Sequence, residues 1–298
     1  MRVAVARYDI AAPSSFDAFA ERQRAWLQDA ADAGARIAVL PEYLSLELAA
    51  TFAPEVQADL PRSLAALQAL RPQWCALYTS LARSLSMHVV AGTFLLDVAG
   101  EGGQAPRYRN RADLFTAQGG HAWQDKLQLT GFEKAVGTIE PGDALKVFAL
   151  DGLRVGIAVC YDIEFPLPVR AQREAGARVL LVPSCTDTEA GAHRVRIGCQ
   201  ARALENRCHV AQAVTAGIAE WSPALDVNTG DAAVYVPMDV GFPADGVLAR
   251  GTPAQRWVLA DVDADVFDAT QASAQVGIDR DWRGQLVPAL ARATLERL

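Results

Sequence analysis

Short apolar stretches alternate with longer amphipathic segments along most of the chain. Strict alternation of apolar and polar residues predicts a strand, whereas apolar residues every three or four positions predict a helix. Gly34 follows the first helical pattern, and Pro72 interrupts the second. These patterns predict strands over residues 2–8, 36–42, 88–96, 108–118, 121–126, 145–150, 153–160, 178–184, 209–216, 231–238 and 257–267, and helices over residues 15–33, 58–86, 169–177 and 191–207.

Two pairs of turn residues join neighbouring strands directly. Gly119 with Gly120, and Asp151 with Gly152, each stand between two strand patterns and predict hairpins. The remaining strands are separated by helices in both halves of the chain. This mixture is typical of an α/β domain with mixed sheets flanked by helices.

The chain shows no boundary that would divide it into domains. No linker rich in Pro, Gly or Ser interrupts the 298 residues, and there is neither a tandem repeat nor a low-complexity block. Hydrophobic residues make up 51% and charged residues 21%, as in ordinary globular proteins. We therefore expect a single domain over residues 1–298, with residues 268–298 as a helix-prone C-terminal tail.

The charge distribution excludes several classes of partner. The net charge is −7, and no basic tract or basic and aromatic stripe suggests a nucleic-acid partner. No apolar run approaches the ~18 residues that span a bilayer, so we expect no membrane partner. The first ten residues, MRVAVARYDI, have the pattern of a strand and not of a signal peptide. We expect a cytoplasmic location.

The five cysteines are too widely spaced for a disulfide framework or a zinc site. They stand at positions 75, 160, 185, 199 and 208, without a Cys-x-x-Cys pair. Most should be reduced, buried and inert. We therefore expect no metal site, and any reactive cysteine must be identified by its context.

Three reactive side chains stand at the carboxyl ends of predicted strands, where α/β folds gather their active sites. Glu42 follows IAVLP, Lys126 closes HAWQD, and Cys160 closes VGIAV. Only three of the 28 basic residues are lysines, so a retained lysine points to chemistry that arginine cannot provide. Backbone N–H groups in the turn after Cys160 would favour its thiolate and bind an oxyanion.

Each of these residues also has an ordinary structural interpretation. Cys160 could end a buried strand as a small apolar residue, although the polar stretch YDIEFP follows it at once. Glu42 could be an exposed turn acid, or a general base whose pKa is raised by burial. Lys126 could be a surface cation, or an ammonium that faces a developing oxyanion. The residues alone leave these alternatives open.

The sequences around these three residues resemble the motifs of the nitrilase superfamily of carbon–nitrogen hydrolases. LPEY, WQDKLQLTGFE and GIAVCYDIEFP are similar to its glutamate, lysine and nucleophile motifs, and VPSCTDT followed by ARALENR resembles the next strand and helix. The resemblance runs from about residue 2 to residue 267. It implies a four-layer αββα sandwich with two mixed sheets, assembly into a homodimer or higher homo-oligomer, and hydrolysis of a small amide without metal or cofactor.

The resemblance also implies a role for each matching residue. Cys160 would attack the carbonyl carbon and form a thioester, while Glu42 would move the protons. Lys126 and the backbone N–H of Tyr161 would hold the oxyanion, and Glu133 would position the lysine and the substrate. A further cysteine, Cys185, either lines the pocket or packs inertly near it.

The chain departs from the family pattern in the nucleophile motif. Many amidase relatives have Arg at the position of Glu164 and an acid at that of Leu167, whereas true nitrilases usually show Trp-Glu where this chain has Tyr161 and Asp162. We expect Asp162 to cap the turn. The leading hypothesis is an amidase; a nitrilase, an N-carbamoyl amidase, an acyltransferase and a non-catalytic binding protein are the alternatives.

Other predictions concern the surroundings of the site. Arg202 and Glu205 should form structural ion pairs or interface contacts, and neither His193 nor His209 has a paired ligand in the sequence. Arginines in loops near the site would suit an amide that carries a carboxylate. The segments 97–107, 217–230 and 241–246 are the candidates for the rim of the pocket.

Overall fold

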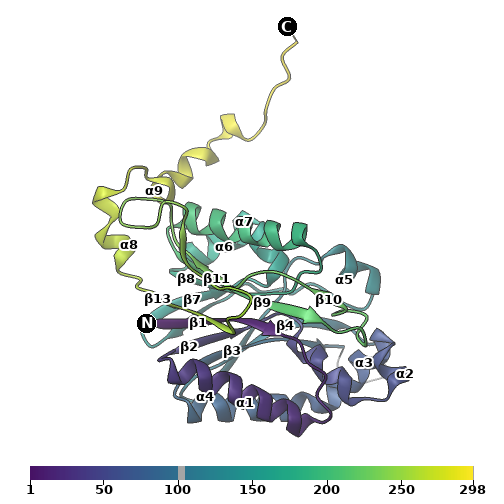
Figure 1. Ribbon diagram of the computed structural model, residues 1–298. Helices are drawn as coiled ribbons and strands as arrows, with labels where there is room; N and C mark the ends of the chain where they lie inside the picture. Colours follow the sequence, from purple (N-terminus) through teal and green to yellow (C-terminus); the bar gives the residue numbers. More distant parts are fainter. Residues whose placement is uncertain (100–104, 298) are drawn as a thin grey trace.

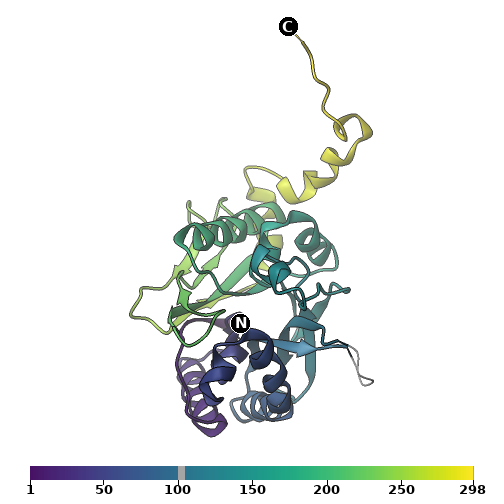
Figure 2. The same ribbon diagram turned by 90° about the vertical axis from the view of Figure 1, so that its right-hand side faces the viewer.

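The structure, a computed structural model, describes residues 1–99 and 105–297. Figures 1 and 2 show two β layers in the middle of the molecule, with helices on the outer face of each layer. The predicted α/β fold with four αββα layers is confirmed.

The first β layer is a mixed sheet. Its three central strands run parallel to one another, and antiparallel strands extend the sheet on both sides. The sequence IAVL at 37–40 is buried throughout, as expected for a strand covered on both faces. The strands of this layer are β1 (Arg2–Asp9), β2 (Ile37–Leu40), β3 (His88–Asp97), β4 (Tyr108–Phe115), β5 (His121–Asp125) and β13 (Trp257–Asp261).

The second β layer has the same mixed character. Three neighbouring strands are parallel, and short antiparallel strands pair with the outer two. Two strands of this layer, at 227–228 and 247–250, were not predicted from the sequence. Its strands are β6 (Val147–Leu150), β7 (Leu153–Ile157), β8 (Val179–Ser184), β9 (His209–Ile218), β10 (Val227–Asn228), β11 (Ala233–Tyr235) and β12 (Val247–Arg250).

The two mixed sheets are joined through β1. Val3 to Val5 pair with β2, while Arg7 to Asp9 pair with β9. One strand can serve both layers because its two ends follow different sheets, so the layers form one curled, hydrogen-bonded system.

Two pairs of long helices cover the outer faces (Figure 1). The helix predicted over 58–86 is interrupted at 68–70, before Pro72 and not at it. Pro72 lies in the first turn of the following helix, where a missing N–H costs nothing. The helices are α1 (Phe16–Asp32) and α4 (Arg71–Ser84) on the first layer, α6 (Pro166–Glu174) and α7 (Glu189–Asn206) on the second, and the shorter α2 (Pro54–Gln57), α3 (Leu60–Leu67), α5 (Gly131–Val136), α8 (Val266–Ala269) and α9 (Ile278–Asp281).

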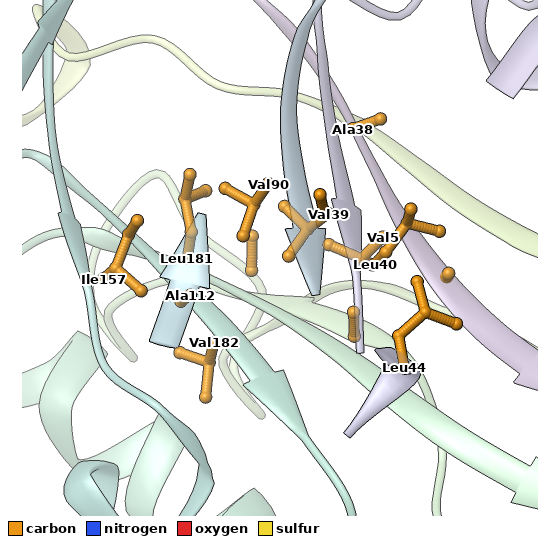
Figure 3. Packing of buried hydrophobic residues seen from close by; sticks show 14 of the residues in the cluster. Val5, Ala38, Val39, Leu40, Leu44, Val90, Ala112, Ile157, Leu181 and Val182 are labelled. Atoms are coloured by element: carbon orange, nitrogen blue, oxygen red, sulfur yellow. The ribbon is translucent and has the colours of Figure 1, made fainter. Parts of the chain in front are cut away.

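The main core lies between the two β layers. Figure 3 shows aliphatic side chains from both sheets pointing toward one another, among them Val39, Val90, Ile157 and Leu181. Each is at most 1% exposed. Burial of such a side chain stabilises the fold by about 1.5–3 kcal/mol, so this interface fixes the strand ends that carry the site.

After α8 the chain leaves the sandwich, and its last residues extend away from the body (Figures 1 and 2). Asp279 of α9 holds the start of this segment against α6, with its carboxylate 2.8 Å from Arg170 and 2.8 Å from Arg173. The division into one domain and a tail stays a prediction. Among the described residues, no helix combines the length and the hydrophobicity needed to cross a membrane.

Candidate active site

A cavity of about 450 Å³ opens at the end of the sandwich where α5 and β10 lie (Figure 1). Parallel strands of both layers end here, as in other α/β sites. Five of the six predicted site residues line the cavity, and the sixth is buried behind it. The five are Glu42, Lys126, Cys160, Tyr161 and Cys185, and the sixth is Glu133.

Glu42 lies just past the end of β2, in a turn that the surrounding backbone fixes. The next residue, Tyr43, has a left-handed conformation with φ of 61°, and its N–H donates to Thr93 Oγ1 over 2.7 Å. The turn packs closely on β3 at Gly92, where a Cβ atom would lie only 2.2 Å from the carbonyl oxygen of Pro41. Only glycine fits there, so this contact sets the position of Glu42.

Lys126 follows β5, and its ammonium lies between two buried carboxylates. Its Nζ is 2.7 Å from Glu42 Oε1 and 2.9 Å from Glu133 Oε2. Asn110 Nδ2 donates to both acids, over 2.8 Å to Glu42 Oε1 and 3.1 Å to Glu133 Oε1. The hydroxyl of Tyr43 donates to Glu133 Oε1 over 2.7 Å. The charges are therefore paired and their oxygens are well supplied with donors.

The two carboxylates differ in their proton affinity. Burial raises the pKa of Glu42, although Lys126 and the thiol of Cys160 oppose the rise. Burial acts on Glu133 too, but the ammonium and several hydrogen-bond donors outweigh it and lower its pKa. Burial alone would lower the pKa of Lys126, yet the two carboxylates raise it above its usual value. The same cluster therefore lowers the pKa of Glu133 and raises that of Glu42.

Cys160 does not end a strand, which corrects the predicted strand over 153–160. The strand β7 ends at Ile157, and Cys160 begins a 3-10 helix over 160–164 with a left-handed φ of 47°. This rare conformation for a residue with a side chain aims the thiol away from the strand and into the cavity. Its Sγ donates to the carbonyl oxygen of Cys185 over 3.4 Å.

The surroundings of the Cys160 thiol favour its protonated form, whereas the N–H groups of the following turn were expected to favour the thiolate. Burial and the neighbouring Glu42 carboxylate raise the pKa of Cys160 well above its ordinary value, and Lys126 only partly opposes them. An uncharged thiol becomes a nucleophile when a base removes its proton during attack. The base must lie beside the thiol, as Glu42 does.

Asp162 connects the nucleophile turn to the segment after β5. Its carboxylate accepts from Val159 N over 3.2 Å, as expected for a turn cap. It also accepts from Leu127 N over 3.1 Å and from Gln128 N over 2.7 Å. Burial raises the pKa of Asp162 to about 7 against these donors. One carboxylate therefore fixes the spacing between the thiol and the ammonium, a role the sequence did not reveal.

Cys185 contributes to the site chiefly through its backbone. Its N–H donates to Glu42 Oε2 over 3.1 Å, so it orients the second carboxylate oxygen. Its thiol lines the cavity and donates to Asn228 Oδ1 over 3.2 Å. Burial raises the pKa of Cys185, as it does for Cys160. Tyr161 also lines the cavity directly after the nucleophile, and the oxyanion role of its N–H stays a prediction.

The remaining candidates divide into structural residues and rim residues. Arg202 pairs with Glu205 over 2.9 Å within α7, which confirms their structural role. His209 is buried, its pKa lowered to about 4 by burial, and its Nε2 lies 3.2 Å from the carbonyl oxygen of Asp263. His193 is exposed on α7. Within the described part of the chain, no group of three or more His, Cys, Asp or Glu residues is placed to hold a metal ion.

One of the three predicted rim segments reaches the cavity. Residues 223–224 and 226–228 line it, which confirms the prediction for 217–230. The prediction for 241–246 is wrong, because Phe242 stacks on Phe267 next to α8, away from α5 and β10 (Figure 1). The described residues of 97–107 contribute nothing to the lining, and residues 100–104 lie outside the described residues.

The part that Asn110 plays in the site was not predicted, although its place in the strand pattern indicates a buried polar side chain. In the alternating strand YRNRADLF, the buried side chains include Tyr108, Asn110, Ala112 and Leu114. A polar residue on the apolar side of an alternating strand is unusual and needs a buried partner. Here the partners are the two acids beside Lys126.

Comparison with known proteins identifies the fold and the family of the chain. The chain shares its fold with Nit3 from Saccharomyces cerevisiae, a member of the nitrilase superfamily, whose structure superposes with a TM-score of 0.71 at 18% identity, over 94% of this chain and 96% of that one. A family model described as carbon–nitrogen hydrolase matches residues 2–242. The chain belongs to the carbon–nitrogen hydrolase family, and the predicted class, hydrolases of non-peptide C–N bonds, is confirmed at the level of the family.

Two curated relatives show how far the similarity extends. Probable hydrolase YhcX from Bacillus subtilis is 28% identical over 95% of this chain, but the chain spans only 54% of the length of that protein. Human omega-amidase NIT2 is 25% identical over 81% of this chain and 82% of its own length.

Proposed function

We propose that the protein hydrolyses the C–N bond of a small linear amide through a thioester on Cys160. The observation that carries this proposal is the meeting of three groups on one cavity wall: a neutral thiol, a carboxylate of raised pKa and a paired ammonium. The name of the human relative, an omega-amidase, supports an amide as the substrate. The proposed reaction uses these side chains, the backbone N–H of Tyr161 and water.

In the first half of the reaction, Glu42 accepts the proton of the Cys160 thiol while sulfur attacks the carbonyl carbon. The negative charge moves onto the carbonyl oxygen, where the Lys126 ammonium and the N–H of Tyr161 stabilise it. When the tetrahedral intermediate collapses, the C–N bond breaks and Glu42 gives its proton to the leaving ammonia or amine. The acyl group stays on sulfur as a thioester.

In the second half, Glu42 takes a proton from water, and the resulting hydroxide attacks the thioester carbon. The C–S bond breaks, the carboxylic acid leaves, and Glu42 returns its proton to Cys160. One amide and one water thus give one acid and one amine. A base of raised pKa suits both halves, because it must accept and release a proton in each.

Lys126 and Glu133 have distinct roles in this scheme. The ammonium lies 2.7 Å from Glu42, so it limits how far burial raises the pKa of that base. Glu133 keeps the lysine charged when Glu42 is protonated, since it remains 2.9 Å from Nζ. Without Glu133, Lys126 would have no carboxylate counter-ion in the intermediates in which Glu42 is protonated.

A trapping experiment tests the thioester. The purified protein is offered small amides, N-carbamoyl amino acids and nitriles, with ammonia release as the measure of turnover. For the best substrate, wild-type protein quenched with acid during turnover should show an acyl adduct in its intact-mass spectrum, because the thioester forms in every catalytic cycle. Peptide mapping should place the adduct on Cys160.

The outcomes separate the alternatives. An adduct on Cys185 would overturn the choice of nucleophile, and a Cys185→Ala variant serves as the matched control. If the protein turned over nitriles and no amide, the substrate class would be nitriles. Absence of both turnover and adduct across the panel would favour a binding protein. The homodimer and the cytoplasmic location stay predictions; light scattering measures the former.

A further inference from the structure

The catalytic cavity carries charges at two depths, and the deeper set is already neutralised. Lys126 contacts two carboxylates, those of Glu42 and Glu133, and all three residues are at most 1% exposed. A substrate that carried its own carboxylate to this depth would meet an ammonium whose charge is compensated twice. The charge preference of the cavity is therefore set nearer its mouth.

The wall toward the mouth is negatively charged. Glu164 ends the 3-10 helix that begins at the nucleophile, Asp187 follows β8, and Asp226 directly precedes β10. Against these three carboxylates, the one cation on this part of the described lining is Arg194 of α7. The expectation that arginines near the site would suit a carboxylate-bearing amide is therefore not supported.

Glu164 is the carboxylate best placed to meet a ligand. Its side chain is 21% exposed, and Arg194 Nε lies 3.6 Å from Glu164 Oε1. That guanidinium is 62% exposed, so water screens the pair and the contact stabilises little. A cation that enters the cavity can take the place of Arg194, which is free to turn into solvent.

We propose that the substrate carries an ammonium or guanidinium group at the end opposite its scissile amide, and that Glu164 selects for it. This inference rests on the proposed function. It also stands on more than a group of acids, because the carboxylates line a cavity of about 450 Å³ that leads to the thiol. Asp187 and Asp226 add to the negative potential that attracts a cation toward the mouth.

The backbone sets the length of such a substrate. Glu164 lies four residues after Cys160 in one 3-10 helix. At about 2 Å rise per residue, the two positions are roughly 8 Å apart along the helix axis. A chain of several methylene groups between amide and cation spans that distance, so short ω-amino amides are the expected class.

Three amides with the same five-carbon chain test this proposal. They are δ-aminovaleramide, which ends in an ammonium, glutaramate, which ends in a carboxylate, and valeramide, which is uncharged. Wild-type kcat/KM should be highest for δ-aminovaleramide. Glu164→Gln should lower the ratio of kcat/KM for δ-aminovaleramide to kcat/KM for valeramide by about tenfold or more, since the lost contact is a charged hydrogen bond. Glu164→Arg should turn the preference toward glutaramate.

A matched control separates local from general effects of charge. In α1, Glu21 Oε1 lies 3.6 Å from Arg24 Nε, the same separation as between Glu164 and Arg194. Glu21→Gln removes one surface carboxylate far from the cavity lining, and it should leave all three values unchanged. A loss equal to that of Glu164→Gln would assign the effect to net charge and overturn the proposal.

The proposal and the function on which it rests fail in different ways. Hydrolysis of valeramide or glutaramate at least as fast as δ-aminovaleramide would preserve the amidase and overturn the charge preference. A preference for δ-aminovaleramide that Glu164→Gln leaves intact would overturn the role of Glu164. If no amide is hydrolysed and no adduct forms on Cys160, the proposed function itself fails.

Discussion

Two buried carboxylates stand five residues apart on one segment of the chain, and they lie in contrasting surroundings. Burial is the main cause that raises the pKa of both Glu42 and Glu47. Glu42 lines the cavity, next to Cys160. Glu47 lies in the 3-10 helix over 44–51, where it accepts from Tyr8 OH over 3.0 Å and from Ala11 N over 3.3 Å.

The contrast shows that burial and a raised pKa do not by themselves mark a catalytic acid. The oxygens of Glu47 face fixed donors, and Arg22 lies 3.6 Å away as its counter-ion. Glu42 shares its environment with a nucleophile and with space for a substrate. Access to a reacting group is what distinguishes a functional site from a structural ion network.

The thiols of Cys160 and Cys199 show the same contrast between a residue on the cavity and a residue sealed in the core. Replacement of Cys160 should have the largest effect on activity. Cys160 and Cys199 are both buried with raised pKa values, but only Cys160 lines the cavity. Cys160→Ala should reduce kcat at least about ten-thousandfold, because the bond-forming atom is lost. Cys199→Ala should keep kcat within about twofold while it lowers the free energy of unfolding by about 1 kcal/mol. Steady-state kinetics and chemical denaturation measure the two effects.

Two results with this pair of variants would contradict the contrast between the two thiols. Retained activity in a well-folded Cys160→Ala protein would remove the nucleophile from the mechanism. Circular dichroism and an unchanged denaturation midpoint show that the variant is folded. A large loss of kcat in Cys199→Ala would instead mean that a sealed thiol matters as much as one on the cavity.

The two carboxylates themselves give the next largest effect. Glu42→Gln should lower kcat about a hundredfold to ten-thousandfold, the usual contribution of a general acid or base. Glu47→Gln leaves the cavity lining untouched, so its kcat should stay within about threefold of wild type. Both variants replace a buried carboxylate with an amide of nearly the same shape.

The Glu47→Gln variant could also give a result that links Glu47 to the site. If Glu47→Gln lowers kcat as much as Glu42→Gln while its fold persists, Glu47 is coupled to the site through the segment that carries both acids. A pH–rate profile separates that case, because loss of the base removes the acid limb of the profile and a change of packing does not.

The positions of Glu42, Lys126 and Cys160 near strand ends were accessible from the sequence. Each follows an apolar stretch whose burial fixes the fold, and strand ends converge in α/β sheets. What the sequence did not reveal depends on contacts between distant segments. Asn110 meets Glu42 across 68 positions, and Asp162 meets the segment after β5 across 34 positions. No local pattern encodes such distances.

One local feature of the sequence indicates a helix that was not predicted. The stretch TGFE at 130–133 is a capping box, in which Thr130 and Glu133 satisfy each other's backbone N–H groups at the start of α5. It predicts a helix where none was expected. The left-handed turn at Cys160, by contrast, contains no glycine that would indicate it. The predicted strand is therefore three residues too long at its end.

The smallest expected effect concerns the free energy of unfolding, and it tests the structural role of Glu47 independently of catalysis. Burial raises the pKa of Glu47 to about 7, while the unfolded chain releases this proton near its ordinary value of 4.5. Between these values the folded state binds more protons, so the free energy of unfolding falls as pH rises. From about pH 5 to about pH 8, wild type should lose about 2 kcal/mol more than Glu47→Gln. Denaturation at both pH values measures the difference, which cancels the contribution of Asp162 because both proteins contain it. Equal losses in the two proteins would show that Arg22 and Tyr8 keep Glu47 ionised throughout.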